Sequence, residues 1–527
     1  MQAGLIAIGF SFLGSPSFAA NPTREEILAA MRKATRFMME TVSHRGGFVW
    51  HYSSDLSQRW GELPARPSQV WVQPPSTPSV GLMLLDAYRK TGNEEYLKYA
   101  ENVAAVLIWG QLPSGGWHYF IDFDSAGVPK WYEDFASKWR GWEEFYHYYG
   151  NATFDDDTTV GPSRFLLQLY KTTLHSKYKV SVIQALDFIV KSQYLNGAWP
   201  QRYPPADKLG SQGHADYTSF YTFNDDVISS NIYLLLEAHE ALGNDHYEKT
   251  ARKGMDFYRL AQLPEPQAGW AEQYDLSLKP ARARTYEPAS VCLDQTLDNI
   301  KELQNFYLLT GDRRYLDPVP AAIRWIERSM IRSDPSSNFT HANFYEVGTN
   351  KPLIVHHDHR KLPNGKFEIV RYWADSEFGG QGIEREMPAS SNKKAVGYHL
   401  GAEYQDSHAK TFEPRKVDLK AIQQTYEEYL RLPVNQAKAQ HGSGLKRPLR
   451  SSDRRALSTA TPEELRGIIG SLDDRGAWLI DIEFLDSLDF THNQPTAFRG
   501  IDTGTYISNM YKLMNALSTE PLNSRRR

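Results

Sequence analysis

Four long stretches of the chain place apolar residues with a helical period, and each stretch contains two such runs. The stretches begin at Val80, Ser163, Ser230 and Asp298. In each, an apolar run is followed by a short turn, a tyrosine and a second, amphipathic run. The pattern predicts helical hairpins that recur about every 70 to 80 residues.

Aromatic loops separate these units. They read "SGGWHYF", "NGAWPQRYP", "AGWAEQY" and "RGAWLID", and the last is followed by another helical run, "GTYISNMYKLMNAL". The first helix of each hairpin is the more apolar, so we expect it to face inward, and long irregular loops on one side favour a closed arrangement with a functional mouth. The expected fold is therefore dominated by α-helices, an (α/α) toroid of repeated hairpins with long loops.

Strand-like alternation is local and appears in "GKFEIVRYW", where we expect a small β-hairpin that turns at "LPNG". The toroid is expected to span residues 21–433. The basic, Gly/Ser-bearing segment 434–460 reads as an exposed linker. A helix then restarts at a capping box formed by Thr461 and Glu464. Residues 461–527 are expected to complete the toroid.

Residues 1–20 have the character of a secretory signal, an apolar stretch followed by small residues. A bacterial secreted or periplasmic protein is therefore expected. No later stretch approaches 18 uninterrupted apolar residues, so we expect no membrane span. The single cysteine, Cys292, leaves no internal disulfide.

Charge excludes one class of partner. The formal net charge of -4 provides no general attraction to nucleic acid, so an anionic partner must be bound by a local basic site. Aromatic residues make up 13% of the chain, which suits stacking against sugar rings as well as filling a large core. The expected protein is a monomer.

Acidic residues gather where the apolar helices begin. "FDDDTTVGPS" carries Asp155, Asp156 and Asp157, and "FNDDVISS" carries Asp225 and Asp226. One acid at a helix start is ordinary capping, but several exceed that need and would repel one another. A hard cation would relieve the repulsion, and oxygen ligands suit Ca²⁺. Capping and metal binding both remain open from spacing alone.

Five ordered motifs resemble those of the family 10 pectate lyases, and they span roughly residues 150 to 385. They are "TFDDDTTVGPSRFLLQLY", "GAWPQRYP", "YTFNDDVISS", "GWAEQYDLSLKPARARTYEP" and "NFYEVGTNKPLIV". The resemblance implies an (α/α) toroid that cleaves polygalacturonate, an acidic polysaccharide, by Ca²⁺-assisted β-elimination.

The same resemblance implies roles for single residues. Asp155, with Asp225 or Asp226, stands where Ca²⁺ and substrate groups are held, and Arg284 in "PARARTYEP" matches the arginine taken as the Brønsted base. Arginine is normally fixed as a cation, so Arg284 would need nearby positive charge from Ca²⁺ or Arg282 to lose a proton. The alternative is an ion pair from Arg284 to a substrate carboxylate, with Arg282 as the rival for either role.

Other residues are candidates for substrate contact. Trp199 and Tyr203 either stack against sugar rings of the substrate or form a structural corner between helices. Asn224 binds either the substrate or its acidic neighbours. Lys351 is a substrate-binding candidate in the last motif. The segment "VHHDHR" from Val355 reads as a polar loop at the cleft rather than a metal site, because adjacent histidines of a strand face opposite ways.

Departures from the family pattern concern the substrate. The family reads close to "DNGAT" where this chain has "DDDTT", and it tends to have arginines where Asn343 and His357 stand here. These positions remain substrate-binding candidates, with fewer uronates or a different polymer implied.

Two functions from other classes also fit the residues. A glycoside hydrolase on the same toroid would use Asp155 and Asp226 as acid and base without a metal. A non-catalytic carbohydrate-binding protein would keep the aromatics and have no use for Arg284.

Overall fold

The structure is a computed structural model, and it describes residues 21–124, 126–134, 148, 150–205, 216–284, 287–331, 340–361, 367–374, 414–436, 460–483 and 497–517. For residues 354–361 and 367–374 it describes the strands and their pairing, without side chains. The expected signal, most of the linker and the "LPNG" turn lie outside these ranges.

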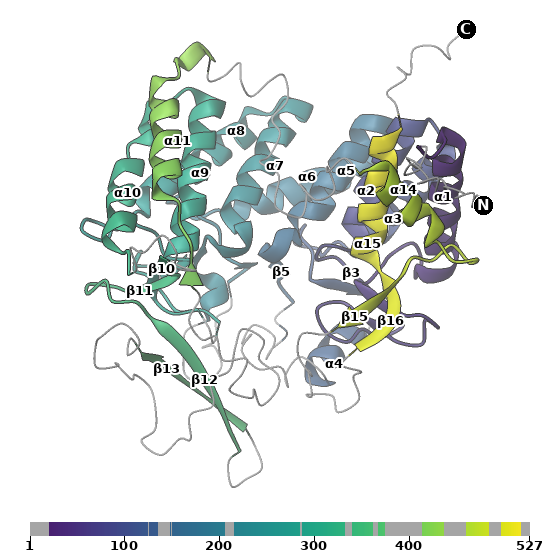
Figure 1. Cartoon of the computed structure of the whole chain (residues 1–527), viewed down its shortest axis with the longest axis horizontal. Coiled ribbons are helices and arrows are strands. Elements are labelled where there is room, and N and C mark those ends of the chain that lie inside the picture. Colours follow the sequence, from purple (N-terminus) through teal and green to yellow (C-terminus); the bar gives the residue numbers. More distant parts are fainter. Residues whose placement is uncertain are drawn as a thin grey trace, which may run out of the picture.

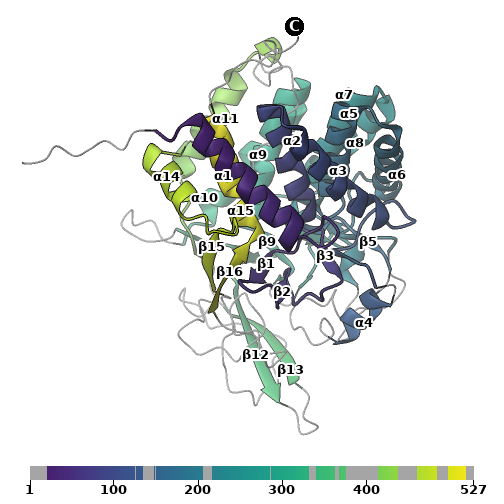
Figure 2. The ribbon, with the colours of Figure 1, turned by 90° about the vertical axis from the view of Figure 1, so that its right-hand side faces the viewer.

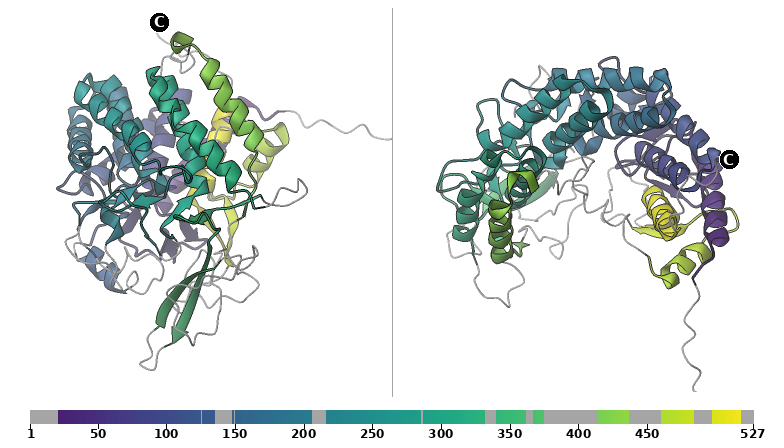
Figure 3. Two further views of the ribbon diagram at one scale, coloured as in Figure 1. Left: turned by 90° about the vertical axis from the view of Figure 1, so that its left-hand side faces the viewer. Right: turned by 90° about the horizontal axis from the view of Figure 1, so that it is seen from above.

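Helical hairpins make up most of the described chain, as the sequence pattern predicts. The first helices of the hairpins are α2 (Thr77–Thr91), α5 (Val160–Thr173), α7 (Val227–Leu242) and α9 (Leu293–Thr310). The second helices are α3 (Glu94–Trp109), α6 (Ser176–Ser192), α8 (Asp245–Leu260) and α10 (Val319–Arg328). Seen from above, the hairpins follow an arc (Figure 3).

One further helix pair joins segments from the N-terminal and C-terminal regions of the chain. Helix α1 (Arg24–Phe37), which continues as a π-helical turn to Val42, packs against α15 (Thr503–Ala516), and α15 also packs against α2 (Figure 2). Contacts between first helices run from α15 to α2, then to α5 and α7. The first helices therefore form the inner layer, and α7 is buried on nearly every face.

In the described ranges, three remaining α-helices lie outside this repeat, α4 (Gly127–Asp134), α11 (Leu419–Arg431) and α14 (Pro462–Gly470). The capping box predicted at Thr461 and Glu464 is confirmed at the start of α14. The domain boundaries themselves stay predictions.

Short strands close the open end of each hairpin, which the sequence analysis did not predict. Each pair joins the strand before an inner helix to the strand after its outer helix. The pairs are β3 (Gln69–Trp71) with β4 (Phe120–Asp122), β5 (Ala152–Thr153) with β6 (Arg202–Tyr203), β7 (Tyr221–Thr222) with β8 (Gln273–Tyr274), and β9 (Ser290–Cys292) with β11 (Phe344–Glu346). Strands of two or three residues are too short to show a period-two pattern.

Other strands form three further sheets in the described ranges. A four-stranded sheet has the order β15 (Leu479–Glu483), β16 (Ala497–Asp502), β1 (His51–Ser53) and β2 (Arg59–Trp60). A second sheet pairs β10 (His341–Ala342) with β14 (Pro414–Arg415). The predicted small hairpin is confirmed as β12 (Ile354–Lys361) and β13 (Phe367–Ala374), which extends away from the helices (Figure 1). The segment "VHHDHR" therefore lies in a strand, and its assignment as a loop was wrong.

The tryptophans of the aromatic loops are core residues that lock each loop onto its hairpin. The indole N–H groups of Trp117, Trp199, Trp270 and Trp478 each donate 2.8 Å hydrogen bonds to a carbonyl near the end of the preceding helix. All four side chains are buried. This fixes the loops at the end of the arc where the inner helices begin, which is called the mouth below (Figure 3).

Candidate active site

Two equivalent turns bring the acidic residues to the mouth of the ring. A 3₁₀ turn, η4 (Asp155–Asp157), leads into α5, and a second, η7 (Asn224–Asp226), leads into α7; the two turns contact each other. Asp156 and Asp157 have φ of 48° and 60°, and Asp225 and Asp226 have φ of 52° and 57°. Aspartate tolerates this left-handed region better than most residues, at some cost in strain.

These acids do not cap their helices. Neither Thr159, the N-cap of α5, nor Asp226, the N-cap of α7, makes a side-chain capping hydrogen bond. The capping interpretation of the acidic clusters is therefore wrong at these two helix starts, and Asp155, Asp156 and Asp225 instead accept hydrogen bonds from Arg284 and Gln73.

Arg284 lies at the centre of these contacts. It belongs to the loop between β8 and β9, and only 6% of it is exposed. Its guanidinium donates to Asp155 Oδ2 at 2.8 Å and to Asp225 Oδ2 at 2.8 Å. A third carboxylate, Glu287, accepts from Arg284 Nη1 at 3.2 Å and from its backbone N–H at 3.0 Å.

Amide side chains extend this network. Asn224 donates to Asp225 at 3.2 Å and to Glu287 at 3.3 Å, and it accepts from Gln273 Nε2 at 3.0 Å. Asn224 thus binds its acidic neighbours, which is one of the two roles predicted for it. Glu287 and Gln273 were missed, although both lie within the motif that carries Arg284.

Residues of the aromatic loops cover Asp155 from the other side. The hydroxyl of Tyr119 donates to Asp155 Oδ2 at 2.7 Å. Asp155 Oδ1 and both amide atoms of Gln201 are buried and have no hydrogen-bond partner among the described residues. Tyr119 and Gln201 occupy the same place in successive loops, two residues after Trp117 and Trp199. That shared spacing is a signal that would have identified both residues.

The two aspartates bound by Arg284 hold their protons very differently. Burial alone would raise the pKa of Asp155, but Arg284 and the hydrogen bonds of its neighbours lower it to about 2. Burial and the charge of Asp155 raise the pKa of Asp225 well above its usual range. Because 30% of the Asp225 side chain is exposed, the nearby carboxylate is the more important cause. Within this pair the charged form is favoured at Asp155 and disfavoured at Asp225.

A further acid comes from a segment that the sequence motifs do not include. Glu62 follows Gly61, where an added Cβ would lie 2.0 Å from the Trp71 ring, so this turn is held tightly against the core. Burial, with Asp156 and Asp155, raises the pKa of Glu62 to about 8. Gln73 donates to Asp156 at 2.6 Å and joins the same group. Glu62 carries no recognisable local pattern and was missed.

Ca²⁺ is implied by the family resemblance, and the donor chemistry of the mouth suits it. In the described ranges, no group of three or more His, Cys, Asp or Glu side chains could hold a metal ion in the arrangement seen. Asp155 nevertheless offers a buried oxygen without a partner, and the raised pKa of Asp225 reports excess negative charge. Both features are what an added cation would satisfy, so the residues fit an oxygen-ligated cation.

The other predicted site residues are scattered. Trp199 has no exposed surface and cannot stack on a sugar, so that prediction was wrong and its structural role holds. Tyr203 is half-buried against Phe188, and Arg282 is half-buried near Arg284. The roles of Tyr203 and Arg282 stay predictions.

Three candidates come from the last motif. Asn343 is buried and accepts the backbone N–H of Asp294 at 3.0 Å, so it is engaged inside the protein. Lys351 is exposed in the turn after β11, and the backbone of His357 lies in β12. Substrate contact by Lys351 and His357 stays a prediction.

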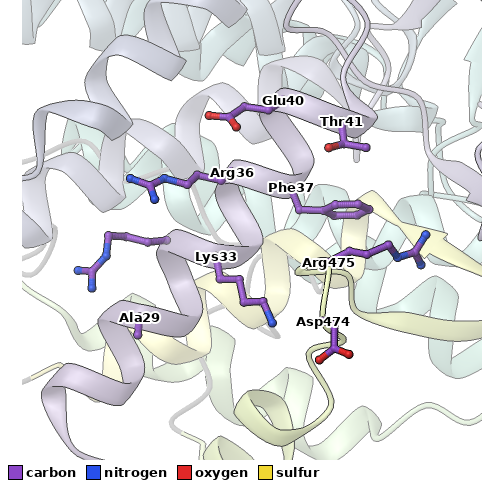
Figure 4. A pocket seen from close by; sticks show the side chains of 9 residues that line it. Ala29, Lys33, Arg36, Phe37, Glu40, Thr41, Asp474 and Arg475 are labelled. Atoms are coloured by element: carbon purple, nitrogen blue, oxygen red, sulfur yellow. The ribbon is translucent and has the colours of Figure 1, made fainter.

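A separate charged recess lies on the outer surface, between α1 and a turn near Asp474 (Figure 4). Three of the cations that line it have partners: Arg36 pairs with Glu95 at 2.9 Å, Lys33 donates to the Asp473 carbonyl at 2.7 Å, and Arg475 pairs with Asp473 at 3.0 Å. This recess therefore ties α1 to the C-terminal region.

Comparison with known families identifies the central part of the chain. The family model described as pectic acid lyase matches residues 123–364. This range contains η4, η7 and Arg284, and it confirms the predicted resemblance and an enzyme of the polysaccharide lyase class. No curated protein sequence matches. None of the helices in the described part of the chain combines the length and apolar character of a membrane span.

Solved structures offer fold comparisons only. A mutant family 10 polysaccharide lyase from Cellvibrio cellulosa, in complex with trigalacturonic acid, is 21% identical, with 53% of this chain and 85% of that chain covered and a TM-score of 0.35. A family 76 glycoside hydrolase (mannosidase) from Bacteroides thetaiotaomicron is 10% identical, with 93% and 98% covered and a TM-score of 0.38. Since both TM-scores are below 0.5, neither superposition carries weight for function.

Proposed function

We propose that this protein, whose residues 123–364 belong to the pectic acid lyase family, cleaves pectate or a related polyuronate by Ca²⁺-assisted β-elimination at the Arg284 cluster. The observation that carries the proposal is the position of Arg284. It is a buried cation at the meeting point of two inner-helix turns, in direct contact with Asp155, Asp225 and Glu287.

The reaction sets clear demands on such a cluster. The C5–H bond of a uronate breaks, and its proton passes to a base while its electrons stay beside the carboxylate. These electrons form the C4–C5 double bond as the C4–O4 bond breaks, and the leaving oxygen takes up a proton. A base must accept the C5 proton, and positive charge must stabilise the negative charge that develops beside the carboxylate.

Arg284 is the candidate base, and its surroundings decide whether it can act. In the structure Asp155, Asp225 and Glu287 all accept hydrogen bonds from the guanidinium, which stabilises its protonated form and opposes loss of a proton. That stabilisation weakens once Asp155 and Asp225 direct their charge to another cation. Arg284 therefore either accepts the proton in that state or acts through its charge on the substrate carboxylate.

Asp155, Asp225 and Asp226 are the residues that would hold Ca²⁺. When bound, Ca²⁺ supplies a Lewis acid next to the substrate carboxylate. The proton on Asp225 must leave for its oxygen to serve as a ligand, since metal ligands are deprotonated. Tyr119 holds Asp155 through its hydroxyl, and the backbone carbonyl of Gln201 holds the neighbouring Phe154.

A hydrolase is the second candidate, and one observation favours it. Glu62 has a pKa of about 8 and Asp155 a pKa of about 2, both in one buried group. Carboxyls with pKa values pushed so far apart are the arrangement that glycosidases use for acid and base. The lyase is preferred because it gives Arg284 a role.

Export is part of the proposal. Pectate is a polymer that an enzyme meets outside the cell, and the apolar segment at residues 1–20 is suited to a secretory signal. A monomer acting on an acidic polysaccharide is the assembly we propose.

Product chemistry tests the proposed function. The protein is incubated with polygalacturonate and with other uronate polymers, first with Ca²⁺ and then with a chelator. We expect ultraviolet absorbance of an unsaturated uronate to rise with Ca²⁺ and to stop with the chelator. New reducing ends without that absorbance would replace the lyase with the hydrolase, and neither signal would contradict both.

A further inference from the structure

A second arginine reaches the mouth of the ring from a segment beyond the family match. Arg415 belongs to β14, which pairs with β10 so that Arg415 lies opposite His341. Its Nε donates to Asp294 Oδ2 at 2.7 Å, and Asp294 lies in the first turn of α9. A strand from residues 414–415 thus places a cation at the start of an inner helix.

Printed contacts connect this arginine to the Arg284 cluster. The backbone N–H of Asn224 donates to the Glu272 carbonyl, and Cys292 contacts the side chains of Glu272 and Asn343 at 3.5 Å each. Asn343 in turn accepts the backbone N–H of Asp294. The path from Asn224 to Arg415 therefore runs along neighbouring helix starts on the same side of the ring.

The repeat places Arg284 and Arg415 at successive positions. The first residues leading into α5, α7 and α9 make the same backbone hydrogen bond to the loop behind them: Phe154 to Gln201, Phe223 to Glu272 and Leu293 to Asn343. Arg284 joins the turns before α5 and α7, and Arg415 binds the start of α9. Arg415 is thus one repeat further along the mouth.

The two arginines differ in how much of their side chains solvent and substrate can reach. Arg284 has 7% of its side chain exposed, whereas Arg415 has 32% exposed. Acids crowd this part of the mouth: Asp226 and Asp294 lie at the starts of α7 and α9, and Asp298 follows one turn after Asp294. A polyuronate carries a carboxylate on every sugar, so a chain crossing these acids needs an accessible cation there.

We propose that Arg415 binds the carboxylate of a second uronate in the substrate chain, next to the sugar held at the Arg284 cluster. Asp294 is the positioning residue that holds Arg415 in place. The inference rests on the proposed polyuronate substrate, and it makes the segment after the family match a determinant of substrate affinity.

The test separates Arg415 from a structural role. In Arg415→Gln we expect KM for polygalacturonate to rise about tenfold with kcat changed less than about twofold, because uniform binding is lost. Arg415→Lys should recover part of the affinity. Methyl-esterified substrate, which lacks the charge, should show little difference between the variant and the unchanged protein.

Controls keep the outcome interpretable. Arg431→Gln removes an arginine whose side chain is 76% exposed and pairs with Glu427, and KM should not change. Asp294→Asn removes the anchor and should raise KM less than Arg415→Gln does. An unchanged KM in Arg415→Gln, as in the control Arg431→Gln, would overturn the proposal. So would an Asp294→Asn variant that raises KM as much as Arg415→Gln does and loses as much melting temperature.

Binding without turnover distinguishes this inference from the proposed function. Calorimetry with a saturated oligogalacturonide reports affinity even where no elimination occurs. Weaker binding by Arg415→Gln alone would support the inference whatever the reaction, and unchanged binding would contradict it.

Discussion

At the scale of single residues, the mouth of the ring is a balance between one buried arginine and an excess of carboxylates. Arg284 neutralises part of the charge, and burial together with the charge of Asp155 raises the pKa of Asp225. Four aspartates adopt left-handed backbone conformations in the two turns that create this arrangement. Such strain is retained where the surrounding structure enforces it, and it often accompanies function.

The raised pKa of Asp225 predicts how replacement of this carboxyl group affects stability. A carboxyl whose pKa is raised by folding favours the folded state at low pH and loses that contribution as pH rises through the folded pKa. Asp225→Asn mimics the protonated group. We expect its free energy of unfolding near pH 7 without Ca²⁺ to stay within about 1 kcal/mol of the unchanged protein, with a growing advantage as pH rises.

Calcium should distinguish the same variant. The unchanged protein should gain melting temperature when Ca²⁺ is added, and Asp225→Asn should gain much less, because an amide is a poorer ligand. Asp245→Asn, at a side chain that is 75% exposed, is the control and should respond like the unchanged protein. An equal gain in all three proteins would remove Asp225 from the calcium site.

At the scale of elements, the site depends on how each aromatic loop is locked to its neighbours. The loop after α6 carries Gly197, whose φ is 99° and whose added Cβ would lie 2.1 Å from the Lys253 carbonyl in α8. This close approach stacks one hairpin on the next and fixes Trp199 and Gln201 behind η4. The loop is therefore part of the support of Asp155.

Substitution of two glycines tests that support. Gly197→Ala should lower the free energy of unfolding by about 3 kcal/mol or more, since it adds a backbone clash to a left-handed conformation. Gly243→Ala has a φ of 68° but nothing within 4 Å of the added Cβ, so about 1 kcal/mol is expected. Urea unfolding followed by tryptophan fluorescence measures both, and equal losses would show that the close approach is unimportant.

At the scale of the whole molecule, segments outside the family match complete the mouth. Residues 123–364 contain Arg284 and its aspartates, whereas Glu62 comes from the N-terminal side and Arg415 from the C-terminal side. The helix α15 also packs against α1 and α2, which joins the two ends of the chain. The charged cluster at the starts of the inner helices therefore draws on more of the chain than the range that the family model matches.

The helical period was sufficient to predict the hairpins, and the ordered motifs singled out Asp155, Asp225 and Arg284, whose side chains are in contact. The roles of these residues and of Asp226 stay predictions. They could not predict the strand pairs, because strands of two or three residues have no readable period. Trp199 was misjudged because the sequence pattern of an aromatic residue in a loop is the same whether its side chain is exposed or buried. Glu62 and Arg415 were missed because only the folded chain brings them to the acids.

The central claim is that elimination depends on Arg284, and the most direct measurement is the ultraviolet rate of unsaturated product formation in Arg284→Ala beside Arg282→Ala, with Ca²⁺ and polygalacturonate. We expect kcat to fall about 10²- to 10⁴-fold in Arg284→Ala, the usual contribution of a catalytic acid or base. Arg282→Ala should retain most of its kcat, because Arg284 makes the contacts to Asp155 and Asp225. An active Arg284→Ala variant, or a greater loss in Arg282→Ala, would contradict the account.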